Sequence, residues 1–191
     1  ACVVHGGELA GINAGDLVFV IGAGPIGLLH AQLAKTYGAK TVVVADISKE
    51  RLAKAAELGA DHTVSSKDPV AEMRQLSENR GADVVIEAVG KPETWETAVR
   101  ATRKGGTTVL FGGCPAGSTV PIDTGTVHYG ELTLKGVFHH TPSNVREALR
   151  LISTRQVKVS PLVTHRMHLS DVEAALRLMQ NGKAIKVALT P

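Results

Sequence analysis

Apolar runs rich in β-branched residues alternate along this chain with amphipathic stretches. The runs that predict strands are Leu17–Ile21, Thr41–Ala45, Thr63–Val64, Asp83–Ala88, Thr107–Phe111 and Leu132–Phe138. Most of them are apolar throughout, which is typical of strands buried on both faces of a parallel sheet. Their alternation with helical patterns and short loops predicts right-handed βαβ crossovers. The expected fold class is therefore α/β, with an open, doubly wound, parallel sheet in the order 3-2-1-4-5-6.

Proline and polar residues mark the starts of several predicted helices. Pro69, Pro92 and Pro142 occupy first helical positions, where a missing N–H costs nothing. Ser170 and Glu173 have the spacing of a capping box ahead of the last predicted helix. The alternation of strands and helices stops after about residue 138. We therefore expect two parts, residues 1–138 and residues 139–191.

Three glycines follow the first predicted strand at G-x-G-x-x-G spacing. Gly22 allows a sharp turn, Gly24 lets the backbone approach a pyrophosphate, and Gly27 lets the next helix pack closely on the sheet. The helix N-terminus then presents free N–H groups to the phosphates. The second strand ends on Asp46, whose carboxylate can accept hydrogen bonds from the adenosine ribose. This full context predicts a Rossmann-type dinucleotide site. Enzymes that use S-adenosylmethionine also combine a glycine turn with an acid, but the pyrophosphate-type spacing argues against them.

The charge of Asp46 decides the expected cofactor. A carboxylate at this position repels the 2′-phosphate of NADP, so NAD is the expected cofactor. Lys49 and Arg51 follow closely and soften that preference. An alternative role for Asp46 is to cap the helix that starts near Ser48.

Two further residue pairs that contain glycine follow predicted strands. Val89 and Gly90 follow the fourth strand, beside the expected adenosine path, and Gly112 and Gly113 follow the fifth, near the nicotinamide. Open α/β sheets bind ligands at these carboxyl ends, although glycine in an ordinary turn is the alternative. Glu87 lies inside a strand that should be buried, so it needs a hydrogen-bond partner there.

Composition narrows the class of protein. Hydrophobic residues make up 43% and charged residues 20% of the chain, as in ordinary globular domains. The net charge of +3 is not gathered in a basic run, so we expect no nucleic-acid partner, and no apolar stretch is long enough for a membrane span. Cys2 and Cys114 lie far apart, which favours a reduced, cytoplasmic setting. The apolar start without methionine indicates the interior of a longer protein.

Neither a metal site nor a catalytic set can be read from the sequence. His139-His140 and the His165-x-x-His168 pair are the histidine clusters, and no carboxylate or cysteine stands at ligand spacing beside them. Cys2 fits a small buried apolar residue better than a zinc ligand. We therefore assign no metal ligand and no catalytic residue to this chain.

Several stretches together carry a family resemblance: AGDLVFVIGAGPIGLLHAQLAK, VVVADISKERLAKAAELGAD, ADVVIEAVGKPETW, GGTTVLFGG, ELTLKGVF and the closing LVTHRMHLSDVEAALRLMQNGKAIKVALT. With them the chain resembles the coenzyme-binding half of the zinc-type medium-chain alcohol dehydrogenases, in particular the sorbitol and threonine dehydrogenase branch. The resemblance implies hydride transfer between a small alcohol and a nicotinamide cofactor, with a catalytic zinc that polarises the substrate oxygen. The family's zinc ligands lie in an N-terminal lobe, on motifs such as G-H-E, which this chain lacks. We therefore expect zinc only in a full-length parent and little or no turnover by this chain alone.

The resemblance also implies roles for single residues. Ile47 should pack on the adenine and Arg51 should reach the ribose, while Phe138 and His139 offer backbone groups to the carboxamide and Lys186 approaches the pyrophosphate. A solvated charge is the alternative for Arg51 and Lys186. The expected cofactor-binding residues are Gly22, Gly24, Pro25, Ile26, Gly27, Asp46, Ile47, Arg51, Val89, Gly90, Gly112, Gly113, Phe138, His139 and Lys186.

In the family, residues 139–191 return to the catalytic lobe. Without it we expect Leu162–Leu169 and Ala184–Leu189 to be mobile, to pair with each other, or to pair with a second chain. Leu132–Phe138, if it is the edge strand, is the expected seam of a homo-oligomer. Two alternatives stay open for the function: a non-catalytic dinucleotide-binding regulatory module, and an NADPH-linked, zinc-independent quinone-type reductase, against which Asp46 argues.

Overall fold

A computed structural model describes residues 1–65 and 68–191. Its strands are β1 (Leu17–Ile21), β2 (Thr41–Ala45), β3 (His62–Val64), β4 (Ala82–Glu87), β5 (Thr102–Leu110), β6 (Thr133–Gly136), β7 (Val163–His168) and β8 (Lys186–Thr190). The first six form one parallel sheet in the order β3-β2-β1-β4-β5-β6. The predicted doubly wound sheet and its strand order are confirmed.

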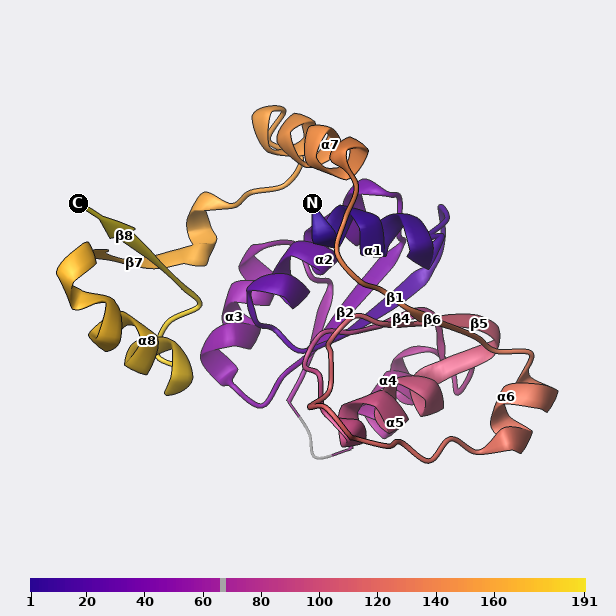
Figure 1. Cartoon of the computed structure of the whole chain (residues 1–191). Helices are drawn as coiled ribbons and strands as arrows, with labels where there is room; N and C mark the ends of the chain where they lie inside the picture. The colour runs from indigo at the N-terminus through magenta and orange to yellow at the C-terminus, as the bar shows by residue number, and fades with distance from the viewer. Residues whose placement is uncertain (66–67) are drawn as a thin grey trace.

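Helices cover both faces of this sheet (Figure 1). They are α1 (Cys2–Ala10), α2 (Pro25–Thr36), α3 (Lys49–Glu57), α4 (Pro69–Leu76), α5 (Pro92–Ala101), α6 (Thr124–Gly130), α7 (Pro142–Ser153) and α8 (Val172–Gln180). Alternate residues of one strand belong to different buried clusters: Val18 packs with Leu28 of α2, whereas Phe19 packs with Met73 of α4. The strands are apolar throughout because each face meets its own layer of helices.

Strand ends differ from the predictions at the far side of the sheet. The bounds of β1 and β2 are as predicted, but β5 begins at Thr102, earlier than expected, and its pairing with β4 shifts register near Ala82. The sixth strand ends at Gly136, so its predicted extension to Phe138 is wrong. The chain leaves the sheet there, because Phe138 is 83% exposed and His139 has a left-handed φ of +59°.

The last strands resolve one open alternative. β7 and β8 pair with each other in parallel, as one of the predicted outcomes required. The predicted capping box is wrong. A 3-10 turn over Leu169–Asp171 precedes α8, its N-cap Asp171 makes no side-chain cap bond, and the Ser170 N–H donates to His168 instead.

The C-terminal elements also share the main core. Leu162 and Ile185 belong to the same buried cluster as the strands of the sheet, although β7, β8 and α8 lie to one side of it (Figure 1). The division at residue 138 therefore stays a prediction.

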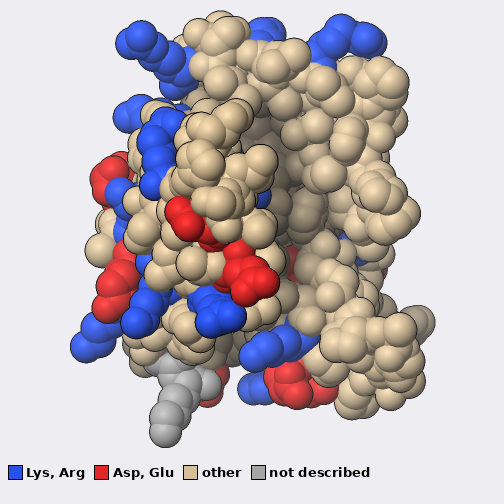
Figure 2. Space-filling model, turned by 60° about the vertical axis from the view of Figure 1, so that its left-hand side comes forward, with Lys and Arg blue, Asp and Glu red and all other residues tan. Residues whose placement is uncertain are grey.

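From another side the surface is hollowed, and Figure 2 shows Lys, Arg, Asp and Glu gathered beside the hollow, with mostly other residue types across it. None of the described helices combines the length and the apolarity that crossing a membrane demands.

Candidate cofactor groove

A cavity of about 590 Å³ opens at the carboxyl ends of β1, β2 and β4. Six of the residues predicted to bind the cofactor line it: Gly22, Gly24, Asp46, Ile47, Arg51 and Val89. Five of them come from the loops after β1, β2 and β4, and Arg51 comes from α3, which the parallel sheet brings to the same edge. This is the position at which open α/β sheets bind ligands, so we call the cavity the cofactor groove.

The glycine loop has the geometry that its spacing predicts. Gly22 has a φ of +102°, and its N–H donates to the Ala45 carbonyl at 2.7 Å. A Cβ on Gly27 would overlap the Gly22 carbonyl oxygen, whereas a Cβ on Gly24 would meet nothing within 4 Å. Gly22 and Gly27 are thus required by the protein itself, and the open space at Gly24 is available to a ligand.

The N-terminus of α2 follows this loop, and its own first turn contains no acidic residue. Gly24 is its N-cap residue, so no side chain caps it. The first N–H groups of a helix have no partner within the helix and carry partial positive charge. An uncapped N-terminus beside a glycine loop suits an anionic ligand such as a pyrophosphate.

Asp46 connects two sides of the groove. Its Oδ2 accepts the N–H of Ala23 at 2.7 Å, and its Oδ1 accepts the N–H of Ser48 at 2.8 Å. The cap of α3 itself is Ser48, whose hydroxyl accepts the N–H of Arg51. The aspartate therefore holds the glycine loop against the turn after β2 while its carboxylate lines the groove.

Two side chains near Asp46, those of Ile47 and Arg51, lack the contacts that their chemistry favours. Ile47 is 95% exposed, although it is apolar and lies on the lining of the groove. The Nε atom of Arg51 is buried, and it has no hydrogen-bond partner among residues 1–65 and 68–191. An exposed apolar side chain and an unsatisfied buried donor each cost free energy, and contact with a bound group can lower that cost.

Glu87 is a site residue whose role was not predicted. It is fully buried at the end of β4, and its Oε1 accepts hydrogen bonds from the N–H groups of Val89 (2.8 Å) and Gly90 (2.9 Å) and from the Thr94 hydroxyl (2.8 Å). Its Oε2 is buried without a partner in the described part of the chain. The carboxylate thus fixes the loop that forms one wall of the groove. The buried acid at the end of a strand was the available sequence signal, but its partners depend on the loop conformation.

The remaining predicted residues do not line this cavity, and their binding roles stay predictions. They are Pro25, Ile26, Gly27, Gly90, Gly112, Gly113, Phe138, His139 and Lys186. Gly90 and Gly112 pack backbone to backbone, because a Cβ on Gly112 would overlap the Gly90 amide nitrogen. The indole of Trp95 donates to the Gly112 carbonyl at 2.9 Å and fixes the loop after β5.

A buried histidine lies behind the groove. His30 of α2 packs edge-to-face on Phe111, with ring centroids 4.7 Å apart, and both ring nitrogens lack partners among the described residues. Burial lowers the pKa of His30 to about 3, because the charged imidazolium cannot be hydrated there. The ring is neutral at physiological pH and acts as part of the core.

The residues that are present do not fit a zinc ion. Within residues 1–65 and 68–191, no three His, Cys, Asp or Glu side chains are close enough together to hold a metal. Cys2 and His140 form a hydrogen-bonded pair, with Sγ and Nδ1 3.1 Å apart. These two side chains are one ligand fewer than the three protein ligands of a catalytic zinc site. We derive no chemical step through a metal in this chain.

Comparisons with known proteins agree with this geometry. The model of the family described as zinc-binding dehydrogenase matches residues 25–154. Sorbitol dehydrogenases from Gallus gallus and Homo sapiens are each 35% identical to the chain over 190 residues, covering 97% of it but only 53% and 52% of those proteins. The chain therefore spans about half the length of these curated relatives.

Solved structures of similar proteins have the same fold. An alcohol dehydrogenase from Thermus sp. ATN1 superposes with a TM-score of 0.90 at 28% identity, covering 99% of this chain and 55% of that one. A zinc-binding dehydrogenase from Sinorhizobium meliloti, solved bound to NADP, gives a TM-score of 0.90 at 33% identity, covering 100% of this chain and 56% of that one.

Proposed function

The chain belongs to the zinc-binding dehydrogenase family, and from this premise we propose that it is the NAD-binding half of an alcohol or polyol dehydrogenase. The observation that carries the proposal is the groove itself, where the glycine loop, the uncapped N-terminus of α2 and Asp46 meet. The similarity to sorbitol dehydrogenases supports a polyol or another small alcohol as the substrate of the intact protein.

Each part of a dinucleotide has a matching feature in this groove. We propose that the pyrophosphate lies over Gly24 against the N-terminus of α2, and that the ribose hydroxyls donate to Asp46. Ile47 would then pack on the adenine, and Arg51 would donate from its unpaired Nε. When bound, the nicotinamide ring would accept the hydride from the alcohol carbon. The protein contributes orientation and a fixed groove wall, which Glu87 holds in place.

We propose NAD as the preferred cofactor over NADP. The 2′-phosphate of NADP would come close to the Asp46 carboxylate, and two negative charges at hydrogen-bonding distance repel each other. The Sinorhizobium relative was solved with NADP, so similarity to the family does not decide between the two cofactors. The preference in this chain therefore rests on Asp46 and on how far Arg51 offsets its charge.

Calorimetric titration of NAD and of NADP tests the proposal. We expect NAD to bind at least about tenfold more tightly, which corresponds to about 1.4 kcal/mol. Asp46→Ser should narrow that ratio, with Asp16→Ser as a control that removes a carboxylate outside the groove. Equal affinity of the unaltered chain for both cofactors, or binding of neither, would contradict the assignment.

We further propose that this chain binds its cofactor without oxidising an alcohol on its own. The described residues provide no metal site, and a family reaction that depends on zinc lacks its Lewis acid here. Mixing the chain with NAD, zinc and sorbitol should give no NADH absorbance. Sustained NADH formation would show that the chain carries a catalytic group.

The edge strand β6 supports a homo-oligomeric arrangement. It ends the six-stranded sheet, so one row of its backbone N–H and C=O groups has no neighbouring strand within the described chain. We propose that a second copy pairs there, because an open strand edge is a template for pairing.

We also propose a cytoplasmic location, for which the two free cysteines give support.

A further inference from the structure

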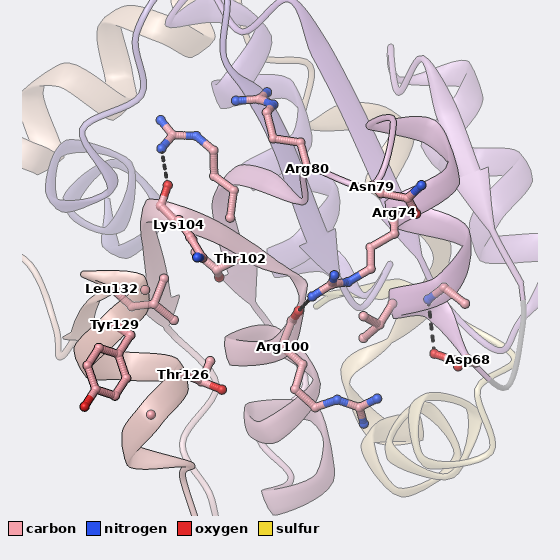
Figure 3. A pocket seen from close by; sticks show the side chains of 15 residues that line it. Asp68, Arg74, Asn79, Arg80, Arg100, Thr102, Lys104, Thr126, Tyr129 and Leu132 are labelled. Carbon is pink, nitrogen blue, oxygen red and sulfur yellow. Dashed lines mark hydrogen bonds between the residues drawn. The ribbon is translucent and has the colours of Figure 1, made fainter.

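A second and larger cavity, of about 1020 Å³, opens at the opposite edge of the sheet, where β4 and β5 begin. Its walls come from α4, α5, α6 and the first residues of β5 (Figure 3). It shares no lining residue with the cofactor groove. The dinucleotide therefore gives no account of this cavity, which we call the basic cavity.

Positive charge gathers around the basic cavity. Its cationic lining residues are Arg74, Arg80, Arg100, Arg103 and Lys104. Two of them are compensated, because Asp83 pairs with Arg80 at 2.8 Å and with Arg103 at 2.6 Å. Arg74, Arg100 and Lys104 form no ion pair with any residue in the described ranges 1–65 and 68–191. Three cations without an ion pair to any described residue thus line the cavity, together with one carboxylate residue, Asp68.

The cations are held in place by the contact between α4 and α5. The Arg74 Nη2 atom donates to the backbone carbonyl of Arg100 at 3.3 Å, so Arg74 and Arg100 meet at one wall of the cavity. Lys104 lies near the start of strand β5 and also lines the cavity. Like charges repel each other, and the attraction of an anion placed between them offsets that repulsion, so the arrangement favours a bound anion.

An aromatic side chain adds a flat apolar surface beside these charges. Tyr129 of α6 lines the basic cavity and is 79% exposed. Its ring contacts His128 edge-to-face, with centroids 4.8 Å apart. The ring face stays available, and exposed aromatic rings beside cations are the surfaces on which nucleobases stack.

We propose that the basic cavity binds a nucleoside diphosphate. Its phosphates would lie between Arg74, Arg100 and Lys104, since guanidinium groups donate paired hydrogen bonds to phosphate oxygens. Its base would stack on Tyr129. The two phosphates carry negative charge that matches the three cations without an ion pair to any described residue, and the cavity has the volume of a small-molecule site.

The experiment must separate this cavity from the cofactor groove, because ADP is also one half of NAD. Amide chemical shifts in NMR spectra of the chain make that separation. Thr126 and Gly130 report on the basic cavity, and Gly22 and Gly24 report on the groove. We expect ADP to shift the first pair in a saturable manner, and to bind roughly tenfold more tightly than pyrophosphate, which has no base to stack.

Two sets of variants assign the contacts. The double variant Arg100→Gln/Lys104→Gln should weaken both ADP and pyrophosphate by at least about tenfold at the basic cavity. The matched control Arg146→Gln/Lys183→Gln removes the same charges from exposed positions elsewhere and should change neither affinity. Tyr129→Ala should lower the affinity for ADP to that for pyrophosphate. All five side chains are exposed, so melting temperatures should stay unchanged.

Several results would overturn the proposal. One is the absence of shifts at Thr126 and Gly130 at millimolar ADP, and another is equal weakening by the control variant. Equal affinity for ADP and pyrophosphate, unaffected by Tyr129→Ala, would refute the nucleotide assignment. Shifts confined to Gly22 and Gly24 would refute this site while leaving the cofactor groove supported, so the two proposals fail separately.

Discussion

Strand β4 carries a buried acid at each end, and the two acids have different kinds of partners. Glu87, at the carboxyl end, accepts hydrogen bonds from two backbone N–H groups and one hydroxyl. Asp83, near the amino end, accepts hydrogen bonds from Arg80, Arg103 and the Leu17 N–H. Burial by itself raises the pKa of Asp83, but these hydrogen bonds outweigh it and hold the pKa well below its usual range.

The different partners of Glu87 and Asp83 show how each edge of the sheet is built. At the carboxyl edge, tight turns bring backbone groups to the cofactor groove, and a Cβ on Gly27 or Gly112 would overlap the backbone of a neighbouring turn. At the amino edge, long side chains from separate helices converge on the basic cavity. The first edge depends on local backbone geometry and tolerates little change. The second depends on the charged side chains that Asp83 pairs.

The largest effect should come from adding one methyl group at the carboxyl edge. In Gly27→Ala the new Cβ would overlap the Gly22 carbonyl oxygen, and rigid backbone cannot move aside as a side chain can. We expect a loss of about 3 kcal/mol in the free energy of unfolding and no measurable NAD binding. Urea denaturation and calorimetry measure the two quantities.

Gly24→Ala is the matched control for this substitution. Its Cβ would meet nothing within 4 Å, so the loss of stability should stay within the roughly 1 kcal/mol that alanine costs at an N-cap position. NAD affinity should still fall, because the methyl group occupies space proposed for the pyrophosphate. Unchanged NAD affinity in Gly24→Ala would place the pyrophosphate elsewhere.

A smaller effect should separate the two buried acids. Glu87→Ala leaves the N–H groups of Val89 and Gly90 without their acceptor, so we expect a loss of about 2 kcal/mol and weaker NAD binding. Asp83→Ala should also lower stability, but NAD affinity should not change, because Asp83 lies at the other edge. Glu93→Ala is the control, since Glu93 is exposed on the same groove wall. Equal NAD affinity of the Glu87 and Asp83 variants would contradict the comparison.

The smallest effect, taken for one pH unit, is a pH dependence that distinguishes the edges. His30 packs on Phe111 behind the groove, and its pKa falls from 6.5 to about 3 on folding. Below pH 6.5 the His30 imidazole therefore binds a proton in the unfolded chain but stays neutral in the folded chain. Stability is complete above that pH and falls by about 1.4 kcal/mol per pH unit as the pH decreases toward 3.

Asp83 contributes in a lower window. Its pKa lies below the ordinary value of 3.8, so its stabilising contribution is complete above about pH 4 and decreases only below it. Between pH 6.5 and 5, His30→Leu should therefore abolish most of the slope of stability against pH, and Asp83→Asn should leave it unchanged. Urea unfolding at a series of pH values measures the slope. A slope that persists in His30→Leu would assign it to another group.

Most of the carboxyl edge could be predicted from the sequence. The bounds of β1 and β2, the turn at Gly22 and the position of Asp46 follow from residues that are close together along the chain. The end of β6 was predicted less well, because Phe138 is apolar and β-prone but projects into solvent. An edge strand has one neighbour, so its end is set by contacts that periodicity does not report.

The class of fold and the glycine loop follow from the sequence alone, because they depend on local periodicity and on where a Cβ is forbidden. The strand order could also be predicted, because alternating strands and helices with a glycine loop are typical of the doubly wound sheet. Which side chains meet across long separations is visible only in the folded chain. The tertiary structure joined Asp46 to Ala23, gave Glu87 its three donors, paired β7 with β8, and surrounded one cavity with cations from α4, α5 and β5. Such contacts depend on the register and packing of whole elements, and spacing along one chain does not specify them.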